Sequence, residues 1–176
     1  MKKIHLCVFV LLSIFFISCD DNPISSSDEF NGNIYELVFS DLFINNGSGH
    51  TSYYADGDTS IKAYYIEFYS GVDSNYFYTG NPFDPSEEFL NRFNGYPKPI
   101  KKGSECNKSI NGVFDKVTNQ RGMILYATNI EIVSSTEFIV NAGWFYGGLN
   151  AGGYTYRIIK DKDQLWIYKK ISRWVS

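Results

Sequence analysis

The chain from Gly112 to its end contains five short runs rich in aromatic and β-branched residues, separated by turn residues. Such runs are typical of half-buried strands, and connections of a few residues join antiparallel neighbours. The pattern therefore predicts an antiparallel meander, and the second of its strands is expected to bend near Asn129. The expected strands are Gly112–Lys116, Met123–Val133, Glu137–Tyr146, Tyr154–Lys160 and Gln164–Trp174.

Two helices and one strand are expected before the meander. Asn33–Ile44 carries apolar residues at the spacing of one helix face, with Asn33 as its N-cap. Ile61–Ser70 alternates in the manner of a strand. A short second helix is expected to follow, with Asp84 as its cap and Pro85 as its first residue.

This order of elements predicts an α+β fold, in which an N-terminal helix and a short second helix pack on a curved antiparallel sheet of four to six strands. A sheet that wraps the first helix buries Leu37 and Phe39 economically. The order resembles the NTF2-like and cystatin-like cone folds. The closing stretch, from Gly152 through Trp166 to Ser176, resembles the ending of small exported bacterial proteins of that shape. The resemblance implies a fold and no particular activity.

The N-terminus has the layout of a secretory signal. Lys2 and Lys3 form a basic head, Leu6–Phe16 is apolar apart from Ser13, and the small residue Ser18 follows. The apolar run is shorter than the about 20 residues that a membrane-spanning helix needs. A cleaved signal peptide is therefore expected.

The sequence Phe16-Ile17-Ser18-Cys19 resembles the lipobox of bacterial lipoproteins, in which the cysteine is lipidated and becomes the first residue of the mature protein. The resemblance implies an S-diacylglycerol and an N-acyl chain, such as palmitate, on Cys19. Two or three chains attach a protein stably to a bilayer, which makes the lipid bilayer its first expected partner. The alternatives are an uncleaved membrane helix and secretion after cleavage elsewhere.

Three regions are expected: a signal peptide at 1–18, a flexible tether at 19–30 and a single α+β domain at 31–176. The tether is polar and rich in serine. The acidic pair Asp20-Asp21 resembles an inner-membrane retention signal of enteric bacteria and a surface-export signal of Bacteroidota. The abundance of Asn, Tyr, Phe and Ile is common in AT-rich genomes and favours the second interpretation. An outer-membrane location in the bacterial envelope is therefore expected over the inner membrane.

The charge and the cysteine content of the chain limit which partners it can bind and what can stabilise its fold. Loss of Lys2 and Lys3 leaves 14 of the 16 basic residues against 19 acidic ones, a net charge near −5. A nucleic acid partner is not expected, because phosphate binding requires a basic surface. Cys106 is the only cysteine beyond Cys19, so no intramolecular disulfide is expected and the domain must rest on its hydrophobic core.

Several groups of residues are candidates for a catalytic, metal-binding or phosphate-binding site, and each has a simpler structural interpretation. Cys106 with His50 could form a nucleophile, although a lone cysteine is more often a buried small hydrophobe. Asp56 and Asp58 with Asp73 could bind calcium, but the EF-hand spacing is absent and a solvated turn is favoured. The glycine-rich run at 147–153 is expected to be a hairpin loop with glycines at positive φ. No cofactor or metal is expected.

Aromatic residues make up 18% of the chain and gather on the last strands. If exposed, they would suit a sugar ring, an apolar ligand or a protein partner; the alternative is that they form the core. The candidate ligand surface consists of Trp144, Tyr146, Tyr154, Tyr156 and Trp166.

The function expected first is a non-enzymatic binding or interaction domain tethered in the envelope, with an unidentified envelope ligand or protein as its partner. The alternative is a small enzyme with an NTF2-like pocket, for which Glu67 or Glu131 is the candidate acid. An inhibitor or immunity-type lipoprotein is a third interpretation, which predicts a flat exposed apolar patch.

Overall fold

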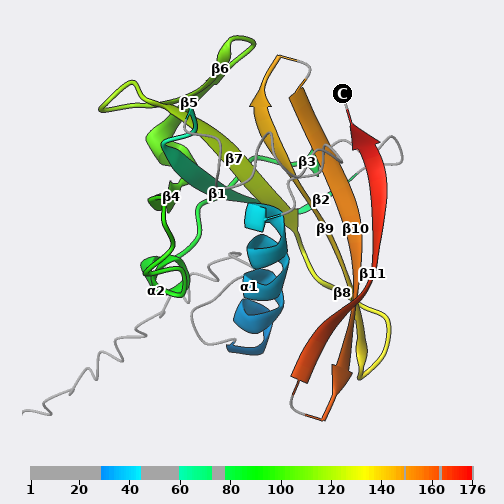
Figure 1. The fold of residues 1–176 in the computed structure, drawn as a ribbon. Coiled ribbons are helices and arrows are strands. Elements are labelled where there is room, and N and C mark those ends of the chain that lie inside the picture. Colours follow the sequence, from blue (N-terminus) through cyan, green and yellow to red (C-terminus); the bar gives the residue numbers. More distant parts are fainter. Residues whose placement is uncertain (1–28, 45–59, 73–77, 149, 163, 176) are drawn as a thin grey trace, which may run out of the picture.

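Five stretches of the chain are described in the computed structural model (Figure 1): residues 29–44, 60–72, 78–148, 150–162 and 164–175. The predictions for the signal peptide and for Cys19, His50, Asp56, Asp58 and Asp73 lie outside these residues. Neither described α-helix combines the length and the apolar character needed to cross a membrane.

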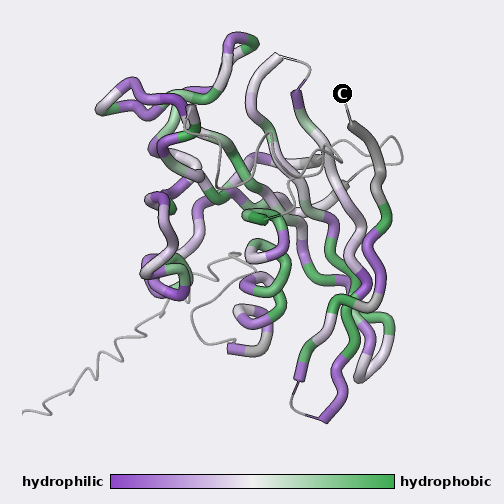
Figure 2. Tube along the Cα trace, viewed as in Figure 1, coloured by the Kyte–Doolittle hydropathy of each residue, from purple (hydrophilic) through white to green (hydrophobic). Residues whose placement is uncertain are grey.

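Helix α1 (Glu29–Ile44) lies in the hollow of a curved, half-barrel sheet (Figure 1). Its hydrophobic side faces the strands (Figure 2), and Ile34, Val38 and Leu42 are fully buried there. The helix begins at Glu29, so the prediction that Asn33 caps it is wrong. The Asn33 side chain instead accepts a hydrogen bond from Nη1 of Arg92 (2.7 Å), which joins the helix to the segment after α2.

The main sheet of the described residues has nine strands, and its central path runs β11-β10-β9-β7-β1-β4. Along this path lie β1 (Ala63–Tyr69), β4 (Ile100–Lys102), β7 (Arg121–Thr128), β9 (Glu137–Gly147), β10 (Asn150–Asp161) and β11 (Gln164–Val175). Three short strands, β5 (Cys106–Ser109), β6 (Gly112–Asp115) and β8 (Glu131–Ile132), pair beside it. A separate pair is formed by β2 (Gly71–Val72) and β3 (Tyr78–Thr79).

The antiparallel meander from β6 to β11 is confirmed. The single strand Met123–Val133 that was expected to bend near Asn129 is instead divided there into β7 and β8. The α+β class is also confirmed, but the sheet is mixed and larger than predicted. Strand β1 runs parallel to both β4 and β7. Parallel neighbouring strands need a long crossover connection. Residues 70–99 connect β1 to β4, and residues 103–120 connect β4 to β7.

The short helix α2 (Glu87–Asn91) lies in the first of these crossovers. Its N-cap is Ser86, whose Oγ accepts a hydrogen bond from the backbone N–H of Phe89 (3.1 Å), and not the predicted Asp84. Asp84 accepts a hydrogen bond from the N–H of Ser104 (2.8 Å) instead. The carboxylate that was expected to cap the helix therefore ties the crossover to the turn before β5.

Two hydrophobic cores lie on opposite faces of the sheet. The larger one fills the concave face, between α1, α2 and the strands. The smaller one, around Tyr65, Cys106, Val113 and Ile124, lies on the convex face beneath the β5–β6 hairpin. The sheet is therefore covered on both faces near β1 and β7.

Candidate functional site

The five aromatic residues of the predicted ligand surface do not share one exposed face. Trp144 and Tyr156 are 1% and 0% exposed, while Tyr146 and Tyr154 are half-buried on the same concave face. Trp166 is 53% exposed. Its neighbours along β11, Leu165 and Ile167, pack against the concave core, so Trp166 points to the convex side.

Tyr156 takes part in a polar contact between the helix and the sheet. Its hydroxyl donates a hydrogen bond to Oδ2 of Asp41 (2.8 Å), and Nζ of Lys170 lies 2.9 Å from the same oxygen. The Lys170 ammonium also lies 4.7 Å from the ring centroid of Tyr154. These contacts join α1 to β10 and β11, so Tyr156 serves the fold rather than a ligand.

Trp144 packs against a glycine of the neighbouring strand. A Cβ on Gly152 would collide with Cη2 and Cζ2 of the indole. Gly152 is paired with Trp144 and lies in β10, so the prediction of a loop over 147–153 is wrong for its last residues. The β9–β10 turn contains Gly147 and Gly148 at φ values of 131° and 59°, as expected for glycines in a hairpin.

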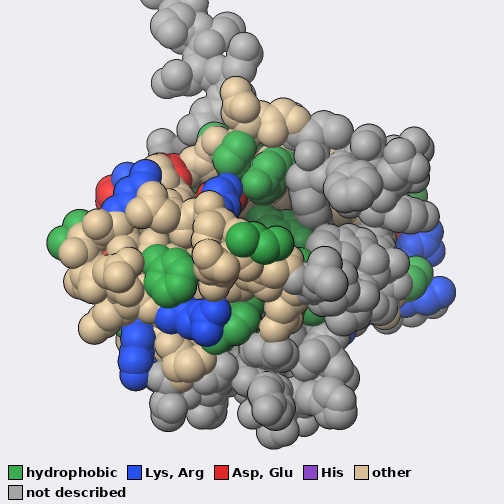
Figure 3. Space-filling model, turned by 90° about the horizontal axis from the view of Figure 1, so that it is seen from above, with side chains coloured by type: hydrophobic (Ala, Val, Ile, Leu, Met, Phe, Trp, Pro, Cys, Tyr) green, Lys and Arg blue, Asp and Glu red, His purple; other side chains and the backbone are tan. Residues whose placement is uncertain are grey.

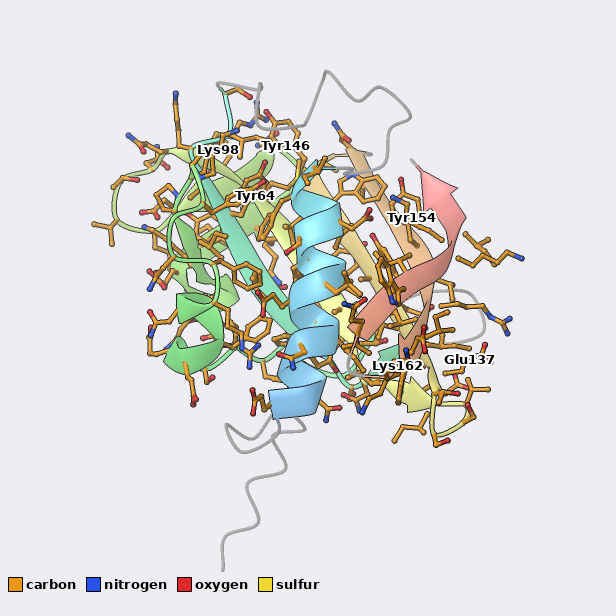
Figure 4. The ribbon with its side chains drawn as sticks, turned by 60° about the horizontal axis from the view of Figure 1, so that its bottom comes forward. Tyr64, Lys98, Glu137, Tyr146, Tyr154 and Lys162 are labelled. Atoms are coloured by element: carbon orange, nitrogen blue, oxygen red, sulfur yellow. The ribbon has the colours of Figure 1, made fainter. Side chains whose placement is uncertain are left out.

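A second aromatic group lies at the end of the concave face near the β9–β10 turn. Tyr64 of β1 is in register with Met123 of β7, and Tyr146 follows Phe145, which is paired with Ile124 of β7. Figure 4 shows Tyr64, Lys98 and Tyr146 together at this end, and Glu137 and Lys162 at the other.

Cations lie over the rings at this end. Nζ of Lys98 is 5.6 Å from the ring centroid of Tyr64. Cζ of Arg121 is 4.6 Å from that of Tyr146 and 5.8 Å from that of Phe114. Seen from above, hydrophobic side chains and Lys or Arg side chains lie next to one another on the described surface (Figure 3). We call these five residues, Tyr64, Lys98, Phe114, Arg121 and Tyr146, the aromatic rim.

The carboxylates proposed as catalytic acids are not in an apolar pocket. Glu67 is 3% exposed and faces the convex side. Both of its carboxylate oxygens lie 2.8 Å from Nζ of Lys108, and the hydroxyl of Tyr69 donates to Oε2 (3.2 Å). Glu131 is exposed on β8. Neither glutamate therefore lies in the closed apolar pocket that the enzyme interpretation requires.

Asp115 forms a second buried ion pair on the convex side. Its Oδ2 lies 2.7 Å from both Nζ of Lys101 and the hydroxyl of Tyr65. Oδ1 accepts hydrogen bonds from the backbone N–H groups of Val117 and Thr118. The Lys101 ammonium, these N–H groups and the Tyr65 hydroxyl hold the pKa of Asp115 well below its usual range.

Cys106 is a buried thiol between these two ion pairs. Its Sγ donates to the carbonyl oxygen of Gly103 (3.2 Å), and burial raises the pKa of the thiol to about 12. A nucleophilic cysteine needs a lowered pKa, so Cys106 has the properties of a small core residue, as the favoured interpretation predicted. The described residues contain no group of His, Cys, Asp and Glu that could hold a metal ion.

Of the aromatic rim only Tyr146 was predicted from the sequence, and Tyr64, Lys98, Phe114 and Arg121 were not. Arg121 was expected in the turn before Met123 but is the first residue of β7, directly opposite Phe114 of β6. An arginine flanked in sequence by turn residues gives no sign of the rings near it, since these come from other strands.

Comparison of the chain with known protein families, with curated proteins and with solved structures finds no match in any of the three.

Proposed function

We propose that this chain is a bacterial lipoprotein, anchored through acylated Cys19 in the cell envelope, whose domain binds a ligand without transforming it. The lipobox-like sequence before Cys19 supports the anchor, and the acidic pair after it supports the outer membrane. We also propose that the helix held in a curved sheet is a cone of the NTF2-like or cystatin-like kind.

The observation that carries the binding function is the aromatic rim. Rings with cations near them lie at one end of the concave sheet. Tyr146 is half-buried there, whereas Tyr64 is 0% exposed and belongs to the core, so Tyr146 is the ring that a ligand would meet. Aromatic faces beside hydrogen-bonding side chains are suited to sugar rings and other flat ligands. The hydroxyl of Tyr146 lies 2.8 Å from Oγ of Ser60, which adds such a polar group.

The arrangement of the buried acids favours binding over catalysis. Glu67 and Asp115 are each paired with a lysine and each accept a hydrogen bond from a tyrosine hydroxyl. These contacts lower the pKa of Asp115, whereas a general acid or base must exchange a proton near the working pH. The same side chains account for the attachment of the β5–β6 hairpin.

The anchor is tested by expressing the full-length chain in a bacterial host and feeding an alkyne-labelled fatty acid. The wild-type protein is expected in the membrane fraction with the label attached. The Cys19→Ser variant is expected to lose both, because serine has no thiol to accept diacylglycerol. Label retained on Cys19→Ser would contradict the proposal.

The binding function is tested with the detergent-purified full-length protein on an array of neutral and acidic oligosaccharides. Loss of ring contacts in Tyr146→Ala is expected to weaken binding up to about tenfold. The control is Trp166→Ala, which removes an exposed ring from the opposite face and is expected to leave binding unchanged. Absence of binding to every oligosaccharide, or a loss confined to Trp166→Ala, would refute the proposal.

A further inference from the structure

Arg121 differs from the other arginines whose side chains are described. Nη1 of Arg92 lies 2.9 Å from Glu36, and Nη1 of Arg157 lies 3.6 Å from Glu137. Arg121 has no carboxylate partner in the described part of the chain. Its one hydrogen bond there runs from Nη2 to the carbonyl oxygen of Asn111 (3.0 Å).

The guanidinium is held in place although no described carboxylate pairs with it. Its Cζ lies 4.6 Å from the ring centroid of Tyr146 and 5.8 Å from that of Phe114. A Cβ on Gly112 would lie 3.1 Å from Nη2, in close contact. Gly112 adopts a φ of 138°, which a side chain would disfavour, so this approach depends on glycine. An arginine held against aromatic rings and by a backbone carbonyl is pre-organised for a partner that meets its edge.

The edge of this guanidinium carries a donor, Nε–H, that no described group accepts. Nε of Arg121 is buried and has no hydrogen-bond partner among the residues that the structure describes. A buried donor without an acceptor costs free energy, and such groups in native proteins call for an explanation. Nε–H and one Nη2–H point the same way in any guanidinium, and together they match the two oxygens of a carboxylate.

A second cation stands next to Arg121. The backbone N–H of Lys62 donates to the carbonyl oxygen of Arg121 (2.8 Å), so the two residues are neighbours across β1 and β7. Lys62 is exposed and, like Arg121, has no carboxylate partner among the described residues. Among the described residues, this end of the sheet therefore carries two cations, Arg121 and Lys62, that no carboxylate pairs with.

We infer that Arg121, held near the rings of Phe114 and Tyr146, binds the carboxylate of an acidic sugar. The inference rests on the proposed binding function and names the ligand class. The planar fork of the guanidinium matches the two oxygens of a carboxylate. The neighbouring groups are Ser60, Asn111 and the Tyr146 hydroxyl, which suit the hydroxyls of a sugar ring. Ile110, 75% exposed at the same hairpin, offers an apolar contact for the ring's C–H face.

The test measures binding of the full-length protein in detergent to tetragalacturonate and to its methyl ester, which keeps the sugar and removes the charge. We expect the acid to bind at least about tenfold more tightly than the ester, as a charged hydrogen-bonded pair would give. Arg121→Lys keeps the charge but not the fork, and is expected to remove most of this preference. Arg157→Lys is the matched control and is expected to retain it.

The outcomes separate this inference from the proposed function. Equal binding of acid and ester, or an unchanged preference in Arg121→Lys, overturns the carboxylate site while leaving a sugar-binding domain. If neither tetragalacturonate nor its methyl ester binds, the assignment to an acidic sugar is overturned. The oligosaccharide array then decides whether the domain binds sugars at all. Preference for a peptide with a free C-terminal carboxylate over its amide, without binding of tetragalacturonate, overturns the assignment in favour of a peptide.

Discussion

The ammonium of Lys108 lies 2.8 Å from each carboxylate oxygen of Glu67, a side chain with 4% of its surface exposed. Lys108 comes from β5 and Glu67 from the centre of β1. A Cβ on Gly103 would collide with the Glu67 side chain, which shows how closely the chain before β5 approaches it. The pair therefore fixes the β5–β6 hairpin to the convex face of the sheet.

Removal of Lys108 is expected to destabilise the domain. Lys108→Ala leaves the buried Glu67 carboxylate without its cation, and such losses cost about 3–5 kcal/mol when both partners are buried. Because Lys108 is 37% exposed, we expect a smaller loss, roughly 1–3 kcal/mol in the free energy of unfolding measured with urea. Lys116→Ala, at an exposed position nearby, serves as the control and is expected to change stability by less than about 0.5 kcal/mol.

The depressed pKa of Asp115 predicts a loss of stability in acid. The folded protein stabilises the carboxylate, so the unfolded chain binds more protons around the ordinary aspartate pKa of 3.8. The contribution of Asp115 is complete above that pH and declines as the pH falls toward the lower folded pKa.

Asp115→Asn is expected to lose roughly 1–3 kcal/mol at pH 7 and to show a shallower decline below pH about 4. Urea unfolding of both proteins across this pH range measures the difference. Parallel curves for wild type and variant would contradict the role assigned to the ion pair with Lys101.

Cys106 is expected to resist alkylation in the folded protein. Burial raises the pKa of its thiol to about 12, so almost no thiolate exists at pH 8. Iodoacetamide treatment followed by peptide mapping is expected to leave Cys106 unmodified until urea unfolds the domain. Rapid modification of Cys106 in native buffer would show that the thiol is accessible and reactive.

Gly152→Ala is expected to disturb the packing of Trp144. The added Cβ meets the indole ring, and crowding of this kind in a packed core costs roughly 1–3 kcal/mol. The near-ultraviolet circular dichroism of the tryptophans is expected to change along with the unfolding midpoint. Lys169→Ala, exposed on the adjacent strand, is the control. Wild-type stability in Gly152→Ala would mean that the Trp144 ring has room to move.

The parts of the fold that were predictable are those with a local signal. The apolar face of α1 and the alternation in β9, β10 and β11 depend on residues close in sequence, and both were predicted. The short strands β4 and β5 were missed, because Ile100–Lys102 and Cys106–Ser109 are polar and become strands only through their neighbours. The parallel pairing of β1 was missed for a similar reason, since partner choice between distant segments leaves no local pattern.

The sequence predicted which residue types the candidate site contains, but not which of them lie together. Tyr146 and Tyr154 were predicted as ligand-facing aromatics, and both are half-buried on the concave side. The role of Arg121 depends on the registers that bring Phe114 and Tyr146 to it from β6 and β9. Such a contact is fixed by turn lengths and strand pairing, which sequence composition does not encode.

The most direct test is mass spectrometry of the mature N-terminal peptide from protein purified out of bacterial membranes. We predict a polypeptide that begins at Cys19, with diacylglycerol on its sulfur and an acyl chain on its amino group. A first residue other than Cys19, or a Cys19 with a free thiol, would contradict the lipid anchor on which the envelope location depends.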